Sequence, residues 1–484
     1  MSTTEPSSQL SRRLFLGGAV AAGGAVAAVN PFSALAASAA RGRPPQRADA
    51  RQGGYGPLSP TPDQRDGVSR LALPAGFSYL GFGFEGDRMS DGNLTPKAHD
   101  GMGALALPNG NVRLIRNHED RDRPGVSPLD GDPASPAYDP LGPGGTTSLE
   151  VKTNADGSAE LVRDFVSLQG TIVNCAGGLT PWGSWITSEE TTAGETQGWT
   201  KDHGYNFEVP GSAEDEITPV PLKAMGRFVH EAVAVDPATG IVYETEDRSF
   251  VEGRDDPATG DRVGSGFYRF IPDTPGDMTA GRLQVLAVRN RPNYNTTVGQ
   301  TINRGLPVVW VDIDDPDPAA AEIDSSAVFR QGLAEGAAVF TRLEGVWPGN
   351  GSIFFASTSG GEAGEGQVWE YRPAGPNGIL RLIFESPSEA VLDNPDNITV
   401  SPRGGVLLCE DGDGETLFMR GLTRNGRIFD FAQELETGRE WCGATFSPDA
   451  NTLFANIQGD TRSGGGGNLG KTFAIWGPFE DGAL

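Results

Sequence analysis

The stretch VNCAGGLTPWGSWITSEET, residues 173–191, decides the fold of this chain. Cys175 opens it, a Gly-Gly-Leu-Thr-Pro segment follows, and a tryptophan-bearing apolar segment leads to Glu189 and Glu190. Cys175 and Glu189 are 14 residues apart. That separation suits two short antiparallel strands joined by a tight turn, because the turn brings the start of one strand beside the end of the other. The stretch therefore predicts a hairpin with a thiol and two carboxylates at one edge of a sheet.

The same design recurs along the chain. Four clear copies begin at Glu231, Glu344, Asp396 and Cys442, and a looser copy begins at His99 and Asp100. The second strands of these copies end in polar residues, namely Glu246 and Asp247, Ser357 and Ser359, Glu410 and Asp411, Asn456 and Gln458, and Asn117, His118 and Glu119. Each copy thus presents both polar ends at the same edge.

The spacing of the copies predicts the architecture. The starts at 175, 231, 344, 396 and 442 are 56, 113, 52 and 46 residues apart. The long interval leaves room for a weaker copy, which we place around GSGFYRFIPD, residues 264–273. A repeat of roughly 40–50 residues made of short strands is typical of a β-propeller. We predict an all-β fold, a single β-propeller of about six blades with short helical insertions, of which AAAEIDSSAVFRQGLAEG at 319–336 is the clearest.

In a propeller the first strand of each blade lines the axis, so the repeated polar ends should converge there. Adjacent carboxylates repel one another strongly unless a cation lies between them. We therefore predict an axial metal site, whose candidate ligands are Cys175, Glu189, Glu190, Glu231, Glu246, Asp247, Glu344, Asp396 and Glu410.

The three cysteines are Cys175, Cys409 and Cys442, and they have no zinc-like spacing. Cys409 lies in the apolar segment VLLCEDG and is expected to be a core residue. Cys175 occupies the position that acids take in other copies, so we interpret it as a metal thiolate. A thiolate among carboxylates favours a transition metal such as iron over calcium alone. The role of Cys442 stays open.

The composition limits the function. The formal net charge of the 484 residues is −26, which argues against a nucleic-acid partner because phosphate backbones require a basic face. Two explanations of the acidity stay open: solubility in a salty or extracellular medium, and carboxylates bound to cations. The chain has no Gly-x-Ser-x-Gly elbow, P-loop or His-Glu-x-x-His motif, so serine hydrolase, nucleotide-motor and zincin functions have no support.

The N-terminal residues resemble an export signal. SRRLFLGG at 11–18 is a twin-arginine pattern, and an Ala/Gly/Val run and an Ala-Leu-Ala cleavage site follow. We divide the chain into a Tat signal peptide (1–36), a flexible leader (37–66) and a propeller domain (67–484). We expect export by the Tat machinery to the periplasm or the outside of the cell, with no membrane span.

Several motifs together resemble the PhoX-type alkaline phosphatase family, also called DUF839. They are the twin-arginine leader, HDGMGA, RNHE, NCAGGLTPWGSW with TSEE, GRFVHEAVAVDP, a Glu-bearing segment before GNG, and DNPDN with TVSPRGG and CEDG. Apart from the leader, the matching features span residues 99 to 458, most of the mature chain. The resemblance implies a propeller with an axial iron–calcium cluster, Fe(3+) and Ca(2+), and hydrolysis of phosphate monoesters.

The chain departs from the family pattern at RLEGVW, residues 342–347, where the family has an RPEW-like segment, and at ETEDRS, residues 244–249. These departures affect the expected substrate more than the expected metals.

Arg342 and Arg248 are candidates for clamping the substrate phosphate, with salt bridges to nearby acids as the alternative. We expect a monomer acting on a small-molecule phosphate ester. The competing functions are a calcium-dependent propeller hydrolase, such as a lactonase or phosphotriesterase, and a metal-braced binding protein without catalysis.

Overall fold

The structure is a computed structural model. It describes residues 54–484 apart from 126–128, 130–133, 254–261, 413, 415 and 437–438. The described residues belong to one compact unit. The predicted signal peptide, and the part of the predicted leader before residue 54, lie outside the described residues. No helix within the described part is both long and apolar enough to cross a membrane.

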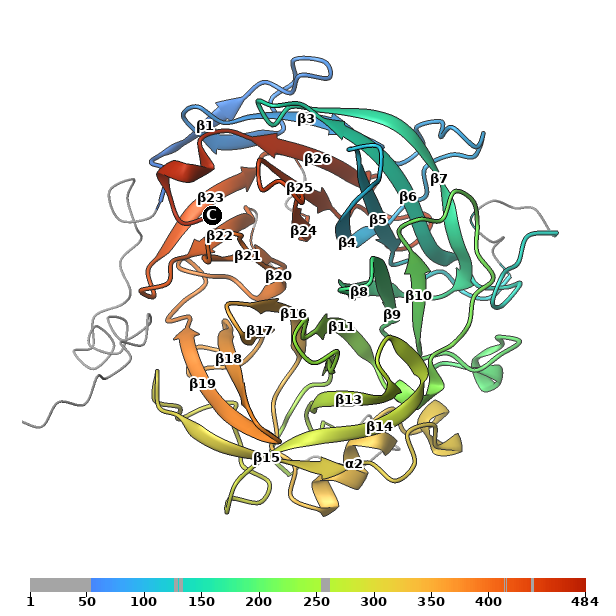
Figure 1. Ribbon diagram of the computed structural model, residues 1–484, viewed down its shortest axis with the longest axis vertical. Helices are drawn as coiled ribbons and strands as arrows, with labels where there is room; N and C mark the ends of the chain where they lie inside the picture. Colours follow the sequence, from blue (N-terminus) through green and yellow to red (C-terminus); the bar gives the residue numbers. More distant parts are fainter. Residues whose placement is uncertain are drawn as a thin grey trace, which may run out of the picture. The chain divides into compact units, whose positions relative to one another are not determined.

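The described strands form five sheets, and because β15 (Leu306–Asp312) joins two blades into one nine-stranded sheet, they make six blades around a common axis, numbered 1 to 6 here (Figure 1). Blade 1 contains β4 (His99–Ala106), β5 (Val112–His118), β6 (Gly144–Thr153) and β7 (Ala159–Thr171). Blade 2 contains β8 (Asn174–Leu179), β9 (Ser184–Glu189) and β10 (Asn206–Pro210). Blade 3 contains β11 (His230–Val235), β12 (Val242–Glu246), β13 (Phe267–Thr274) and β14 (Asp277–Val288).

The other three blades have the same antiparallel order. Blade 4 contains β16 (Leu343–Gly349), β17 (Ser352–Ser357), β18 (Gln367–Ala374) and β19 (Asn377–Glu385). Blade 5 contains β20 (Pro395–Val400), β21 (Val406–Glu410), β22 (Phe418–Leu422) and β23 (Ile428–Glu434). Blade 6 contains β24 (Trp441–Phe446), β25 (Thr452–Ile457), β26 (Lys471–Trp476) and, from the other end of the chain, β3 (Ser78–Phe82).

The inner strands β4, β8, β11, β16, β20 and β24 contact one another in a closed ring. Blade 6 is completed by β3, which pairs with β26 from Ser78 opposite Trp476 to Phe82 opposite Thr472. The prediction of a single propeller of about six blades is therefore confirmed.

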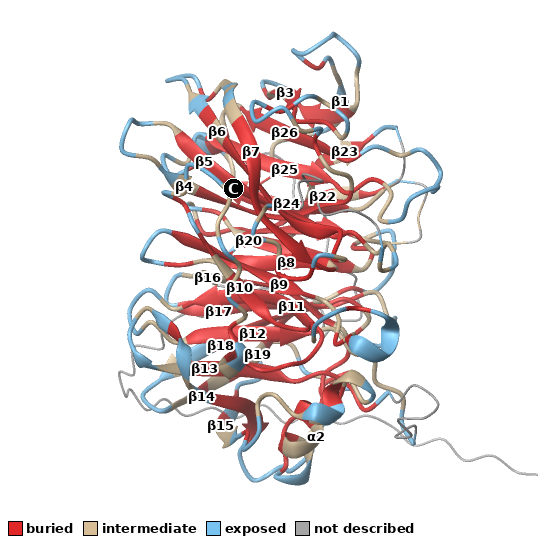
Figure 2. Cartoon of the chain, turned by 90° about the vertical axis from the view of Figure 1, so that its right-hand side faces the viewer, coloured by how far each residue is buried: buried red, intermediate tan, exposed pale blue. Residues whose placement is uncertain are grey.

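Each blade interface holds a hydrophobic core of its own. Between blades 6 and 1, for example, Phe82 and Phe454 pack with Leu114 and Leu149. Six such clusters cover the six interfaces. The buried residues in Figure 2 accordingly follow the strands, and the exposed ones lie mainly in the connections. Separate small cores explain how the chain exceeds the usual size of a single-core domain.

Two sequence predictions about the blades need correction. Residues 264–273 are not a further inner copy, because they form β13, the third strand of blade 3. The long interval is filled instead by the outer strands of blade 3 and by β15 (Leu306–Asp312), which pairs with both β14 and β19. The interval also holds the helical insertion predicted at 319–336, now seen as η4 (Ala319–Glu322) and α2 (Ala327–Ala334). The remaining short helices are η1 (Glu195–Gln197), η2 (Lys223–Met225) and η5 (Phe479–Asp481).

The predicted leader also ends earlier than residue 66. β1 (Leu58–Thr61) pairs with β2 (Leu71–Pro74), and β2 pairs with β23 at the outer edge of blade 5. Tyr55 donates a hydrogen bond to the carbonyl of Leu484 over 3.0 Å and packs edge-on against Phe77. One aromatic anchor and edge pairing thus order a segment whose polar, proline-rich composition predicted flexibility.

Candidate metal and phosphate site

All six inner strands have a backbone irregularity near their start. The first residue of each pairs with the last residue of the next strand, as Asn174 pairs with Glu189. A register shift follows directly in blades 1 to 5, and in blade 6 it follows one residue later, after Cys442. Such a β-bulge re-aims the side chains beside it. In blades 1 to 5 the second residue of the inner strand is thereby turned out of the regular sheet alternation, whereas Cys442 pairs with Asn456.

These second residues form an axial ring, which consists of Asp100, Cys175, Glu231, Glu344, Asp396 and Cys442. All six are buried. They fall into overlapping groups whose ligand atoms lie within 4.8 Å of one another, namely Asp100–Glu119–Cys175, Cys175–Glu190–Glu231, Glu231–Glu344–Asp396 and Asp100–Glu440–Cys442.

A second layer comes from the residues just after the second strand of each blade, which are Glu119, Glu190, Asp247, Thr358, Asp411 and Gln458. The backbone N–H of each donates to the carbonyl of the residue preceding the inner strand, over 2.8–3.2 Å. We call this hydrogen bond the closing bond. It occurs in all six blades and brings these residues to the edge that carries the axial ring.

Burial makes this concentration of acids costly. It raises the pKa values of Asp100, Glu231 and Glu344 well above the usual range, and neighbouring carboxylates raise them further. Within the described residues neither carboxylate oxygen of Glu231 has a hydrogen-bond partner. Buried, unsatisfied carboxylates beside a thiol are a donor set for metal cations, which would replace the missing hydrogen bonds and offset the repulsion. The residues present therefore fit a multi-metal cluster.

Two arginines lie against this acidic edge. Arg342 contacts Asp247 through Nε at 3.0 Å and Glu344 through Nη2 at 2.9 Å. Arg121 contacts Glu119 and Glu190 through its own Nη2. Burial raises the pKa of Glu190 to about 7 and that of Asp247 to about 6, although the neighbouring guanidinium opposes each shift.

Five of the predicted ligands, Cys175, Glu190, Glu231, Glu344 and Asp396, lie within the metal-like groups. Asp247 lies beside them, where it interacts with Glu190 and Arg342.

Glu189, Glu246 and Glu410 lie elsewhere. They end their strands one residue before the second layer, so their side chains point to the opposite side of the strand. Glu189 accepts hydrogen bonds from the backbone N–H groups of Ile172 and Gly204 at 3.0 and 2.8 Å, and it pairs with His203 at 2.6 Å.

The other two acids have similar partners. Glu246 accepts from Tyr268 Oη at 2.8 Å, and Glu410 accepts from Arg420 Nε at 2.6 Å. Each of the three acids thus braces its own blade, and metal binding by them stays a prediction without geometric support.

The guanidinium of Arg248 acts on Glu246, whose pKa it lowers against the larger effect of burial. Its backbone carbonyl accepts hydrogen bonds from Ser265 Oγ at 2.6 Å and from the N–H of Arg342 at 2.9 Å. Its contact with substrate phosphate stays a prediction.

The sequence interpretation missed Glu440 and did not assign Asp100, Glu119 or Cys442 as ligands. Asp100, Glu119 and Cys442 occupy the same repeat positions as Cys175 and Glu190, so alignment of the copies by their strands would have found them. Glu440 precedes its inner strand and has no acidic counterpart in the other blades. Cys409 lies in the core between blades 5 and 6, as predicted.

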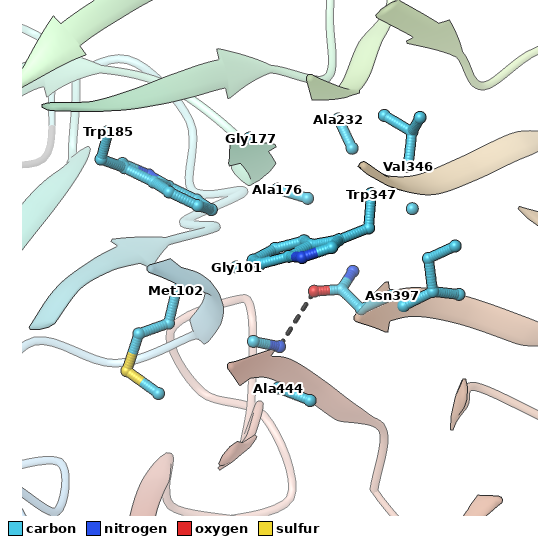
Figure 3. A pocket seen from close by; sticks show the side chains of 13 residues that line it. Gly101, Met102, Ala176, Gly177, Trp185, Ala232, Val346, Trp347, Asn397 and Ala444 are labelled. Carbon is cyan, nitrogen blue, oxygen red and sulfur yellow. Dashed lines mark hydrogen bonds between the residues drawn. The ribbon is translucent and has the colours of Figure 1, made fainter. Parts of the chain in front are cut away.

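The next residue in sequence after each member of the axial ring lies near the centre of the propeller. Gly101, Ala176, Ala232, Gly345, Asn397 and Gly443 all line one small pocket there (Figure 3). Its volume is about 10 Å³, the space of about one water molecule. A side chain at Gly101 would meet the backbone of Ala176 at 2.5 Å, so close strand packing requires glycine here. The inner strands are consequently packed closely together on this side of the axial ring.

The chain is similar to several known proteins. The family model "Alkaline phosphatase PhoX" matches residues 53–460. The crystal structure of Pseudomonas fluorescens PhoX in complex with vanadate, a transition-state analogue, aligns with a TM-score of 0.64 and 17% identity over 89% of this chain and 99% of that one. A gluconolactonase from Xanthomonas campestris aligns with a TM-score of 0.40 and 12% identity over 90% of this chain and 95% of that one.

None of the curated proteins matches the chain. The match to the family model spans most of the chain, and the PhoX crystal structure has the same fold. The chain therefore belongs to the PhoX family of alkaline phosphatases.

Proposed function

We propose that the protein is an exported, metal-dependent phosphatase that hydrolyses phosphate monoesters at an axial iron–calcium cluster. The observation that carries the proposal is the chain of overlapping groups around the axis, in a member of the PhoX family. Within each group, buried or partly buried carboxylates and, in three of the groups, the thiol of Cys175 or Cys442 lie within 4.8 Å of one another. Carboxylate oxygens suit calcium, and a thiolate suits iron.

Cys175, Glu190, Glu231, Glu344 and Asp396 are the proposed core of the ligand set, and Asp100, Glu119, Asp247, Glu440 and Cys442 extend it. Cys175 would have to lose its proton to bind iron, because burial and the surrounding acids raise its pKa well above the usual value. When bound, the cluster supplies positive charge that stabilises the charge developing on the phosphoryl group.

The residues of the chain orient the substrate. Arg342 is held at one side of the site by Asp247 and Glu344, while about a third of its side chain is exposed. A guanidinium held in this way can donate parallel hydrogen bonds to phosphate oxygens.

Export by the Tat machinery belongs to the same proposal, and the support for it is the twin-arginine pattern at 11–18. Tat transports folded proteins, so the cluster would be filled before export. Replacement of Arg12 and Arg13 by lysine should leave the protein in the cytoplasm of an expressing cell. Undiminished export of that variant would exclude this route.

The test of the catalytic proposal is metal analysis of protein purified without chelators, followed by assays on phosphate monoesters, phosphate diesters and lactones. We expect iron and calcium together with hydrolysis of monoesters in preference to diesters. Metal-loaded protein that hydrolyses lactones but no phosphate ester would contradict it.

A further inference from the structure

We propose that Arg121 is a second phosphate-binding arginine, which acts opposite Arg342 and favours dianionic monoesters; this inference rests on the proposed phosphatase function. Arg121 follows the second layer of blade 1, and its backbone N–H donates to the carbonyl of Thr461 at 2.9 Å. This bond ties the residue to blade 6, so its position does not depend on a free loop.

The two arginines have corresponding environments. Arg121 Nη2 contacts Glu119 and Glu190, and Arg342 contacts Asp247 and Glu344. Their side chains are 36% and 35% exposed, so about a third of each is in solvent and the rest lies against the acidic edge.

A single pair of acids separates them. The carboxyl groups of Glu190 and Asp247 interact directly, Glu190 contacts Arg121, and Asp247 contacts Arg342. The arginines therefore flank one stretch of the site, on blades 1 and 4.

Each arginine keeps donors for a ligand. Among the described residues, no hydrogen-bond acceptor faces Nε or Nη1 of Arg121, or Nη1 of Arg342. Both side chains reach the surface at the edge where the acids converge. Arginine donors fixed in orientation and open to solvent match the non-bridging oxygens of a phosphoryl group.

The two-arginine arrangement also predicts specificity. A phosphate monoester offers three non-bridging oxygens and about two negative charges, whereas a diester offers two such oxygens and one charge. A single guanidinium can donate hydrogen bonds to both non-bridging oxygens of a diester. A second guanidinium therefore adds affinity only for a monoester. Arg121 should therefore contribute mainly to the affinity for monoesters and for inorganic phosphate.

The experiment compares Arg121→Gln, Arg121→Lys and Arg65→Gln in the metal-loaded enzyme. Arg65 is a matched control, because it is 35% exposed and paired with Asp87 at 2.8 Å in the outer part of the propeller. Calorimetric titration with inorganic phosphate should show binding weakened by about 10- to 100-fold in Arg121→Gln, the usual worth of one or two charge-assisted hydrogen bonds. Arg121→Lys should recover part of the loss, and Arg65→Gln should bind phosphate like the unaltered protein.

Two readouts separate this role from a structural one. Loss of a positive charge beside Glu119 and Glu190 should leave the metal content unchanged or higher, whereas a bracing residue would lower it. The ratio of kcat/KM for a monoester to that for a diester should fall about tenfold in Arg121→Gln.

Unchanged phosphate affinity and an unchanged ratio would overturn the inference while the phosphatase function stands. If the unaltered enzyme hydrolysed no monoester, the proposed function would fail, and the phosphate titration would still decide whether Arg121 binds the anion.

Discussion

The backbone N–H of Glu190 donates to the carbonyl of Val173 over 2.8 Å, and Val173 itself has a left-handed backbone with φ of 51°. The residues whose carbonyls accept the corresponding bond in three other blades, Ala98, Arg342 and Asn394, also have positive φ. Strained backbone of this kind persists only where its surroundings enforce it, and it is common at functional sites. This corner fixes which of two consecutive acids faces the axis.

Glu189 and Glu190 should therefore respond differently to the same substitution. Glu190→Gln removes a proposed ligand, so we expect lower metal content and turnover in a chain that stays folded. Glu189→Gln weakens a buried pair with His203 and should lower the free energy of unfolding by about 3 kcal/mol or more. Metal analysis and urea unfolding of both variants make the comparison. Similar losses of metal in both would show that Glu189 is also a ligand.

The stability should decrease in alkali because of His203. Burial lowers its pKa, but Glu189 and Asp139 more than offset this and raise it to about 9. Since the folded pKa exceeds the unfolded value of roughly 6.5, the pair stabilises fully below pH ~6.5 and loses its contribution as the pH rises through about 9. Unfolding midpoints measured from pH 6 to 10 should fall across this interval. His203→Gln should flatten that fall, and an unchanged profile in the variant would assign the loss to other groups.

Two of the three cysteines provide a separate prediction. Cys175→Ala should remove visible absorbance from an iron–thiolate and most of the activity, with the fold retained. Cys409 is fully buried among apolar side chains, so Cys409→Ala should cost about 1 kcal/mol of stability and leave the absorbance in place. Absorption spectra and thermal unfolding distinguish the two. If Cys409→Ala removed the absorbance and Cys175→Ala kept it, Cys409 would be the iron ligand and Cys175 the core residue.

Arg342 should matter for its shape as well as its charge. Its Nε and Nη2 hold Asp247 and Glu344, and a lysine cannot make both contacts while it also faces the substrate. We expect Arg342→Lys to lower kcat/KM for a monoester by about tenfold or more. Arg248→Ala, measured in parallel, tests the predicted role of that arginine. A lysine variant as active as the unaltered enzyme would remove Arg342 from phosphate binding.

The repeat could be recognised from sequence because each hairpin carries its own polar ends and turn. Strand alternation and spacing were sufficient for the propeller and for about six blades. The outer strands of blade 3 and the pairing of β3 with β26 were not predictable in the same way, since both depend on contacts between distant segments.

The site could be predicted only to within one residue. The pairs Glu189–Glu190 and Glu246–Asp247 look equivalent in sequence, but the bulge and the closing bond direct only the second acid of each pair to the axis. No local sequence pattern identifies Arg121, because its role depends on contacts with Glu119 and Glu190, which only the fold brings beside it.

The most direct test of the account is to measure metal content and monoester turnover on the same chelator-free preparation, before and after removal of calcium. The account predicts iron and calcium bound to the protein, hydrolysis of a simple phosphate monoester at alkaline pH, loss of turnover on chelation, and its return with added calcium. Protein that contains iron and calcium yet hydrolyses no phosphate monoester would contradict it, and so would turnover that persists when neither metal is bound.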